Sequence, residues 1–311
     1  MSSVFHTSFF AMGTRCHVIF PGIDTDRGEQ IASVLKQEIN RVETVLSRFI
    51  AYSDIALINK KAQKEPVEVS EETFRILKMC KDYHLRTEGA FDITLRKLLD
   101  YWKNRDSNEE ASLDLYEILD ASGTKNVLLD EEKRTVFLAN ETVEIDLGGF
   151  GKGYALHTLG EFLDDFAIEN VFISFGESSV VTRGRHPAGS HWKIGVNNHQ
   201  VPGESIHTFA VNEGSVSTSG NFYLDNHGKL QNHRHVINPF TGYPVKDLVT
   251  VSVCAASPIV AEILSTAYLV LSDDVLDVVH HDIPDCEIVK INYSAPEPEI
   301  RIVHKKSDAS A

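Results

Sequence analysis

A glycine-rich segment with a single lysine constrains the fold of this chain more than any other feature. Residues 143–157 read V-E-I-D-L-G-G-F-G-K-G-Y-A-L-H. The first residues alternate apolar and acidic side chains, which predicts the end of a β-strand, and a helical pattern begins at Tyr154. Four glycines surround Lys152 between these two patterns. We therefore expect a strand, a glycine-rich turn and a helix start in close succession.

Such a succession is typical of an anion-binding turn. Glycines let backbone N–H groups approach a phosphate, the helix N-terminus adds partial positive charge, and the lysine adds a full charge. Neither common nucleotide-binding fingerprint fits. Gly153 follows Lys152 where a P-loop has Ser or Thr, and the G-x-G-x-x-G spacing is not met. A glycine-rich turn with a solvated lysine is the alternative interpretation.

The composition allows a sizeable hydrophobic core. The 311 residues are 42% hydrophobic, which is enough for one large domain or two moderate ones. The formal net charge is −15, from 45 acidic and 30 basic residues. Binding to nucleic acid or to an anionic membrane is not expected, because both require a basic face. The four cysteines lie far apart and predict neither a disulfide framework nor a metal site.

The N-terminal sequence indicates where the protein resides. M-S-S-V-F-H-T-S-F-F has no basic segment followed by an apolar one and no lipobox cysteine. No stretch of the sequence is apolar for long enough to span a membrane. We expect a cytoplasmic protein without membrane insertion, or a periplasmic one if the sequence is that of a processed form.

Helical and strand patterns alternate along the rest of the chain, without an internal repeat or a linker. Helices are expected over residues 25–47, 70–86, 115–121, 154–166 and 259–270, near 54–59 and 274–280, and up to Trp102. Strands are expected over 8–20, 67–69, 127–130, 135–139, 170–183, 192–196, 207–212, 249–255, 287–291 and 300–303. These patterns predict one α+β unit, with a helical lobe inserted near 70–125 and a disordered tail at 305–311.

Seven segments, taken in order, resemble the ApbE family of flavin transferases, also called FAD:protein FMN transferases. The segments are A-M-G-T (11–14), L-S-R-F…S-D-I-A-L-I-N (46–59), G-A-F-D-I-T (89–94), D-L-G-G-F-G-K-G-Y-A (146–155), S-T-S-G-N-F (217–222), H-V-I-N-P-F-T-G (235–242) and A-E-I-L-S-T-A (261–267). The resemblance implies one ApbE-like domain over residues 1–304. It also implies a T-fold-like, two-lobed antiparallel β core with flanking helices.

The resemblance also implies an activity. Family enzymes use Mg²⁺ to split FAD and attach its FMN part, through a phosphoester bond, to a Thr or Ser of a partner flavoprotein. Other members mainly hydrolyse FAD to FMN and AMP. We accordingly expect FAD as a substrate, Mg²⁺ as a cofactor and an acceptor flavoprotein as a partner.

The metal ligands implied by the resemblance come from one helix and from the glycine-rich turn. They correspond here to Glu262, Thr266 and the backbone carbonyl of Gly151. A spacing of four places Glu262 and Thr266 one turn apart on the same helix face, and Mg²⁺ prefers such hard oxygen ligands. The family usually has Asp at the position of Glu262.

Three residues correspond to the catalytic positions. Lys152 is expected to contact the pyrophosphate, with a structural salt bridge as the alternative. His235 is expected to act as a general acid or base, because imidazole titrates near neutral pH. The alternative is a histidine that packs beside His233. Asn238 stands where the family usually has Asp, and a turn residue is its alternative role.

The resemblance further implies a flavin pocket. Met12 and Phe49 stand where the family holds the isoalloxazine ring between a methionine and an aromatic residue, usually Tyr; core packing is their alternative. The other expected contacts to FAD or to the loops around it are Asp92, Gly148, Gly149, Lys152, Gly176, Glu177, Thr218 and Ser219. Gly-Gly-Asp is usual at positions 176–178, and Asp is usual where this chain has His157.

Three functions therefore remain open at the level of sequence. The first is Mg²⁺-dependent transfer of FMN to a partner protein. The second is FAD binding without catalysis, suggested by the departures at His157, Glu177, Asn238 and Glu262. The third is FAD pyrophosphatase activity, in which water replaces the acceptor hydroxyl.

Overall fold

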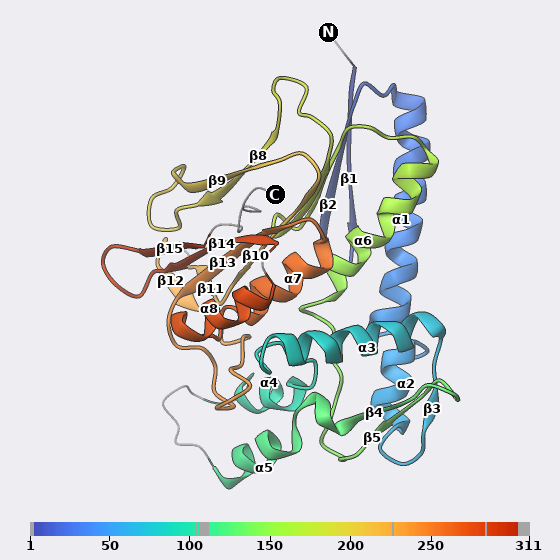
Figure 1. Cartoon of the computed structure of the whole chain (residues 1–311), viewed down its shortest axis with the longest axis vertical. Coiled ribbons are helices and arrows are strands. Elements are labelled where there is room, and N and C mark those ends of the chain that lie inside the picture. The colour runs from blue at the N-terminus through green and yellow to red at the C-terminus, as the bar shows by residue number, and fades with distance from the viewer. Residues whose placement is uncertain (1–2, 104, 106–111, 226, 284, 304–311) are drawn as a thin grey trace, which may run out of the picture.

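The centre of the protein is an antiparallel sheet of eight strands. The computed structural model describes residues 3–103, 105, 112–225, 227–283 and 285–303. The strands follow the order β1 (Val4–Ala11), β2 (Thr14–Pro21), β6 (Val171–Phe175), β7 (Ser179–Arg183), β10 (Gly214–Gly220), β13 (Val249–Ala255), β14 (Cys286–Asn292), β15 (Glu299–Val303). Strands from both ends of the chain therefore meet in one sheet (Figure 1).

Three small sheets are also present in the described residues. They are the hairpin β8 (Trp192–Asn197) and β9 (Ser205–Val211), the pair β11 (Phe222–Leu224) and β12 (Leu230–Asn232), and the three strands β3 (Val67–Glu68), β5 (Thr135–Leu138) and β4 (Val127–Asp130). The β8–β9 hairpin packs on one face of the large sheet, in a cluster that includes Phe209, Val216 and Ile291. Together with the helices, these sheets make an α+β fold, as the sequence predicts.

Eight α-helices occur in the described residues, and four of them begin with a side-chain cap. They are α1 (Thr25–Leu46), α2 (Asp54–Lys61), α3 (Glu71–Arg86), α4 (Arg96–Lys103), α5 (Leu113–Ala121), α6 (Gly151–Asp165), α7 (Pro258–Ala267) and α8 (Asp273–Asp282), with a 3₁₀ turn at Thr124–Asn126. The side chain of Ser70 accepts from the Thr73 backbone N–H at the start of α3, and Ser257 does the same for α7. No helix in the described part of the chain is both long and apolar enough to cross a membrane.

Helix α6 packs against both α1 and α7 on one side of the large sheet (Figure 1). Helix α6 approaches α7 closely, because a Cβ at Gly153 would stand 2.5 Å from the Pro258 carbonyl oxygen and 2.6 Å from Glu262 Cβ. Only glycine fits at this crossing. As a result, the start of α6 lies directly on the middle of α7.

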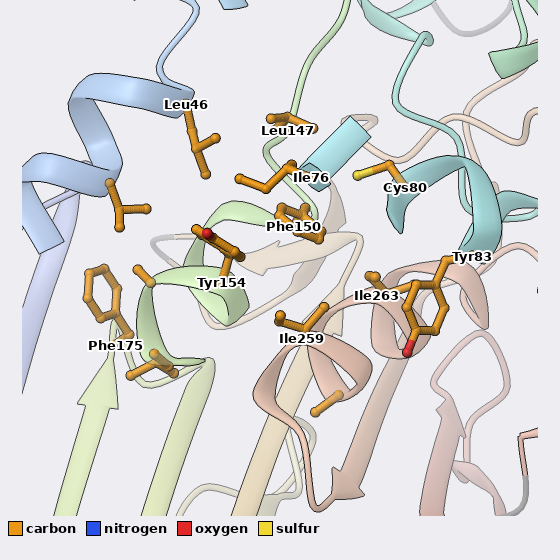
Figure 2. Close-up of a cluster of buried hydrophobic side chains, with 14 of the residues drawn as sticks. Leu46, Ile76, Cys80, Tyr83, Leu147, Phe150, Tyr154, Phe175, Ile259 and Ile263 are labelled. Atoms are coloured by element: carbon orange, nitrogen blue, oxygen red, sulfur yellow. The ribbon is translucent and has the colours of Figure 1, made fainter. Parts of the chain in front are cut away.

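Apolar side chains of these helices form the main core. Phe150 and Tyr154 stack with ring centroids 5.6 Å apart, and Ile259 and Ile263 reach the same cluster from α7 (Figure 2). Full burial of each such side chain contributes roughly 1.5–3 kcal/mol. The core therefore fixes both helices that carry the predicted site.

The strand expected before the glycine-rich turn is not formed, so this prediction is wrong. Residues 143–147 run extended, with only an isolated bridge between Leu95 and Glu144. The side chain of Asn59 takes the place of a neighbouring strand. Its Oδ1 accepts from the Ile145 N–H at 2.7 Å, and its Nδ2 donates to the Ile145 carbonyl at 2.9 Å. The alternation of apolar residues thus reflects burial of this segment, which does not pair with a neighbouring strand through a ladder of backbone hydrogen bonds.

Helix α6 also begins earlier than expected, at Gly151 instead of Tyr154. The Leu147 carbonyl accepts from the N–H groups of Phe150 and Gly151, so the turn passes directly into the helix. Lys152 consequently belongs to the first helical turn and not to the loop.

Helices α3, α4 and α5 occupy one end of the molecule (Figure 1). A separate apolar cluster of Leu98, Trp102, Leu115 and Ile237 joins α4 and α5 to the segment that follows His235. The indole Nε1 of Trp102 donates to the Gly242 carbonyl at 2.7 Å. The predicted tail at 305–311 lies outside the described residues.

Candidate functional site

The glycine-rich turn and the start of α6 separate two adjoining cavities. One has a volume of about 550 Å³ and the other about 440 Å³, and Asp146, Gly148 and Lys152 line both. The predicted residues that line the first cavity are Asp92, Gly148, Gly149, Lys152, Thr218, Ser219, His235, Glu262 and Thr266. Those that line the second are Met12, Phe49, Gly148, Gly151 and Lys152. Most of the predicted site is therefore brought together around Lys152.

The ammonium group of Lys152 makes three contacts. Its Nζ donates to Ser178 Oγ and to Ser179 Oγ, each at 2.9 Å. It also forms an ion pair with Glu262 Oε1 at 2.9 Å. Lysine has three N–H donors, so each of them has a protein acceptor.

The carboxylate of Glu262 is equally well bonded and is almost fully buried, with 3% of the residue exposed. Its Oε2 accepts from Ser179 Oγ at 2.6 Å and from Ser217 Oγ at 2.9 Å, while Oε1 faces Lys152. Burying a carboxylate is costly unless it is paired and hydrogen-bonded. These three donors meet both conditions.

Hydroxyl groups continue this network towards Thr266. Ser265 Oγ donates to Ser217 Oγ at 3.2 Å and shares a hydrogen bond of 2.9 Å with Ser219 Oγ. Thr266 Oγ1 donates to the Glu262 carbonyl at 3.2 Å and lies 3.3 Å from Ser219 Oγ. Both predicted polar residues of α7 therefore face the large sheet at β10.

Asp146 shapes the glycine-rich turn. Its Oδ1 accepts from the Gly148 N–H at 2.9 Å, and its Oδ2 pairs with Arg48 Nε at 2.9 Å. The guanidinium of Arg48 in turn lies 3.9 Å from the centre of the Phe49 ring. A continuous series of contacts thus joins the glycine-rich turn to Phe49, one of the two predicted contacts to the flavin ring.

The two predicted flavin residues line the same cavity but differ in their surroundings. Met12 has a left-handed φ of 47°, its N–H donates to Glu43 Oε2 at 2.9 Å, and its Cε would stand 3.1 Å from a Cβ at Gly151. Phe49 is 80% exposed. A strained backbone of this kind persists only where the surrounding contacts hold it, so Met12 is fixed in place while Phe49 stays accessible.

His235 lines the larger of the two site cavities. Its ring lies 4.6 Å from that of His233, in an edge-on arrangement. Partial burial, reinforced by the charge of His233, lowers the pKa of His235 to about 4. Its imidazole is therefore neutral near pH 7 and has a lone pair available to accept a proton.

Asn238 and Asp92 both hydrogen-bond within their own loops. Asn238 Oδ1 accepts from the Phe240 N–H at 2.9 Å, and Asn238 lines a neighbouring groove of about 890 Å³ instead of either site cavity. Asp92 Oδ1 accepts from the Thr94 N–H and hydroxyl at 2.7 and 2.6 Å, and desolvation raises the pKa of Asp92. The geometry agrees with the alternative role of each as a residue that shapes its loop.

Two predicted contacts lie outside the linings of both cavities. Gly176 and Glu177 form the β6–β7 turn, with φ values of 61° and 59°. A Cβ at Gly176 would stand 2.4 Å from Thr14 Oγ1, so the turn requires glycine there. His157 is exposed on α6, with its ring 6.5 Å from that of Tyr154.

Several residues that hold the site were not predicted from the sequence. They are Arg48, Ser178, Ser179, Ser217 and Ser265. One signal was present, because Ser217 and Ser219 alternate along β10 and must therefore face the same side of the sheet. Among the described residues, no three His, Cys, Asp or Glu side chains form a group that could hold a metal ion.

The fold and the site together define a class: an α+β protein in which a lysine at a helix start lies between two cavities. The particular family follows from the sequence. The model of the ApbE family matches residues 12–289, and this chain belongs to that family.

Individual relatives agree with this assignment. The chain is 28% identical, over 247 residues, to an FAD:protein FMN transferase of Chlamydia muridarum, covering 77% of this chain and 75% of that protein. It is 25% identical to the FAD:protein FMN transferase of Escherichia coli K12 over 273 residues, covering 85% and 77%.

Solved structures show the same fold. The ApbE protein of Thermotoga maritima matches with a TM-score of 0.80 at 27% identity, over 98% of this chain and 97% of that one. The flavin transferase ApbE of Vibrio cholerae matches with a TM-score of 0.84 at 20% identity, over 98% of both chains. The prediction of an ApbE-like α+β fold is confirmed.

Proposed function

We propose that this protein transfers FMN from FAD to a Thr or Ser hydroxyl of a partner flavoprotein. The observation that carries the proposal is the position of Lys152, at a helix start where two cavities adjoin. FAD is a long molecule with a pyrophosphate between two bulky ends. Lys152 and the helix N-terminus suit the pyrophosphate, and each end then has a cavity of its own. The names of the curated relatives support this assignment.

In this proposal the isoalloxazine ring occupies the smaller cavity. Met12 supplies a polarisable thioether and Phe49 an accessible aromatic ring on the wall of that cavity. Arg48 lies close to the Phe49 ring, so the guanidinium is positioned beside the flavin as well. The pyrophosphate then lies beside Lys152, Gly148 and Gly149.

The proposed reaction replaces one phosphorus–oxygen bond with another. The acceptor hydroxyl oxygen attacks the phosphorus on the riboflavin side of the pyrophosphate, and a phosphoester bond forms. The anhydride bond to AMP breaks, and AMP leaves with the bonding electrons. His235 takes the proton of the hydroxyl, and its imidazole is available for this because it is neutral near pH 7. Lys152 offsets negative charge on the phosphoryl oxygens.

Mg²⁺ is part of the proposal, although Thr266 lines the larger site cavity and Gly151 the smaller one. Thr266 Oγ1 and the Gly151 carbonyl are hard oxygen donors on the contacting helices α7 and α6. Glu262 is the third predicted ligand, but Lys152, Ser179 and Ser217 already bond to its two oxygens. When bound, Mg²⁺ would neutralise charge on the phosphates.

Incubation with FAD, Mg²⁺ and a flavoprotein acceptor tests the proposal. We expect covalent flavin on the acceptor, seen as fluorescence in a denaturing gel, and one AMP released for each flavin attached. Thr266→Ala should reduce this labelling, and Gly160→Ala, at an open position of α6, serves as the control. If the wild-type enzyme leaves the acceptor unlabelled, the transferase function is refuted.

FAD binding without catalysis is the second candidate. The engagement of Glu262 with Lys152 and the role of Asn238 in its own turn favour it. A binding protein would show FAD affinity that is insensitive to EDTA and no AMP release. AMP release in the absence of any acceptor would instead indicate the pyrophosphatase activity.

A further inference from the structure

The pair formed by Lys152 and Glu262 carries an inference about how the proposed site binds an anion. Each partner is connected to the other twice, directly at 2.9 Å and through Ser179, which accepts from Lys152 and donates to Glu262. Ser217 also donates to Oε2 of the carboxylate, at 2.9 Å. This closed ring fixes the position of both charges relative to β7 and β10.

Glu262 has little capacity left for a metal ion. A carboxylate offers about four lone-pair positions, and three of them accept from Lys152, Ser179 and Ser217. The remaining position is on Oε1, the oxygen that faces the ammonium group. A divalent cation there would lie beside a positive charge in a buried, weakly screened place, and the two would repel each other.

Lys152, by contrast, has one contact that can be exchanged at small cost. Its bonds to Glu262 and Ser179 belong to the ring, while Ser178 is a neutral hydroxyl that lines the larger cavity. A phosphate oxygen bonds to an ammonium group more strongly than a hydroxyl does. An anion in the cavity can therefore replace Ser178 while the ring stays intact.

We propose that Glu262 is a positioning residue, which acts through Lys152 and does not ligate a metal. It holds the ammonium group so that the N–H now bonded to Ser178 is presented to a phosphate in the cavity. The inference rests on the proposed function, since FAD is the anion concerned. It also accounts for two departures of this chain from its family, the carboxylate at 262 that is one methylene longer and the hydroxyl at 178.

FAD affinity measured without divalent cations, by quenching of flavin fluorescence in EDTA, tests the inference. We expect Glu262→Gln to weaken FAD binding roughly tenfold, because Lys152 loses its charged anchor. Lys152→Met should weaken it by a similar factor. The double variant should be no weaker than Lys152→Met alone, because the two residues act as one unit.

The neighbouring serines provide a matched pair. Ser179→Ala breaks the ring and should weaken FAD binding, whereas Ser178→Ala removes only the competing acceptor and should leave affinity equal or higher. Both replacements keep every charge, so this pair decides the question even if Glu262→Gln does not fold. Glu161→Gln, an exposed carboxylate on α6, controls for the change in net charge and should have no effect.

Two results would overturn the inference. If Glu262 is a metal ligand, Glu262→Gln will bind FAD normally in EDTA and will instead require more Mg²⁺ for half-maximal binding. Equal weakening by Ser178→Ala and Ser179→Ala would show that the ring has no special role. Failure of the wild-type protein to bind FAD would overturn the proposed function and the inference together, so the two kinds of failure are distinguishable.

Discussion

At the scale of single residues, the site depends on buried charges whose partners come from distant parts of the sequence. Lys152 and Glu262 lie 110 positions apart and meet at 2.9 Å. An ion pair of this kind is weak evidence for stability, since removing both charges can be neutral, but removing one partner leaves the other buried and unpaired. The presence of both charges therefore contributes to the site more than to the stability of the fold.

The pH dependence of His235 is a prediction at this scale. Because the pKa of His235 is lowered to about 4, a base at this position is neutral above that pH and is lost only as the pH falls through it. Activity should therefore stay level from pH 8 to about 5 and decline as the pH falls through about 4. His233→Gln removes the neighbouring charge and should raise the pKa of His235. The decline of activity at acidic pH should then begin at a higher pH.

NMR titration of the His235 ring measures this pKa directly, without relying on activity. His186→Gln is the control, because His186 is an exposed histidine that lines neither site cavity. It should leave the titration of His235 unchanged. A pKa of His235 near its ordinary value of 6.5 in the wild-type protein would contradict the prediction.

At the scale of elements, the crossing of α6 and α7 decides where the site forms. Gly153 lets the two helices touch, and the first turn of α6 then presents Lys152 to Glu262. A larger residue at 153 must push against the Pro258 carbonyl, which belongs to rigid backbone. The same displacement would separate the two charges.

Replacing two glycines of α6 separates packing from helix propensity. Gly153→Ala should destabilise the protein by about 1–3 kcal/mol, because overpacking outweighs the gain in helix propensity. Gly160→Ala lies in open space on the same helix and should stabilise by about 0.5–1 kcal/mol. Urea unfolding measures both, and a stabilised Gly153→Ala would show that the helices can move apart freely.

At the scale of the whole molecule, the α4–α5 lobe packs against the segment after His235. Ile237 packs with Leu98, Trp102 and Leu115, and Trp102 donates to the Gly242 carbonyl. The lobe therefore anchors the turn that follows the proposed base. A site assembled in this way depends on contacts far from the chemistry.

Replacement of the two tryptophans tests this dependence. Trp102→Phe leaves the buried Gly242 carbonyl without its donor, which should cost about 1–2 kcal/mol and speed hydrogen exchange over residues 238–243. Trp192→Phe removes a comparable bond, from Trp192 Nε1 to the Arg183 carbonyl at 3.2 Å, and should not change exchange there. Equal exchange in the two variants would contradict the anchoring role.

Local patterns were enough for most of the elements and for much of the site. Helical periodicity predicted α1 and α3 nearly to their ends, and Ser70 marked a helix start correctly. The prediction failed before the glycine-rich turn, where Asn59 hydrogen-bonds to Ile145 and replaces a strand partner. A side chain 86 positions away leaves no trace in a local pattern.

The sequence by itself determined the family and the α+β class, and it predicted many of the residues that line the two cavities beside Lys152. It did so because these features rest on local periodicity and on ordered motifs. Only the tertiary structure decided what those residues bond to. The resemblance implies a metal ligand at Glu262, but in the structure its carboxylate pairs with Lys152 where α6 and α7 cross, and the serines of β7 and β10 hydrogen-bond to it. The partners of a buried charge are set by which elements pack together, and that information is not local.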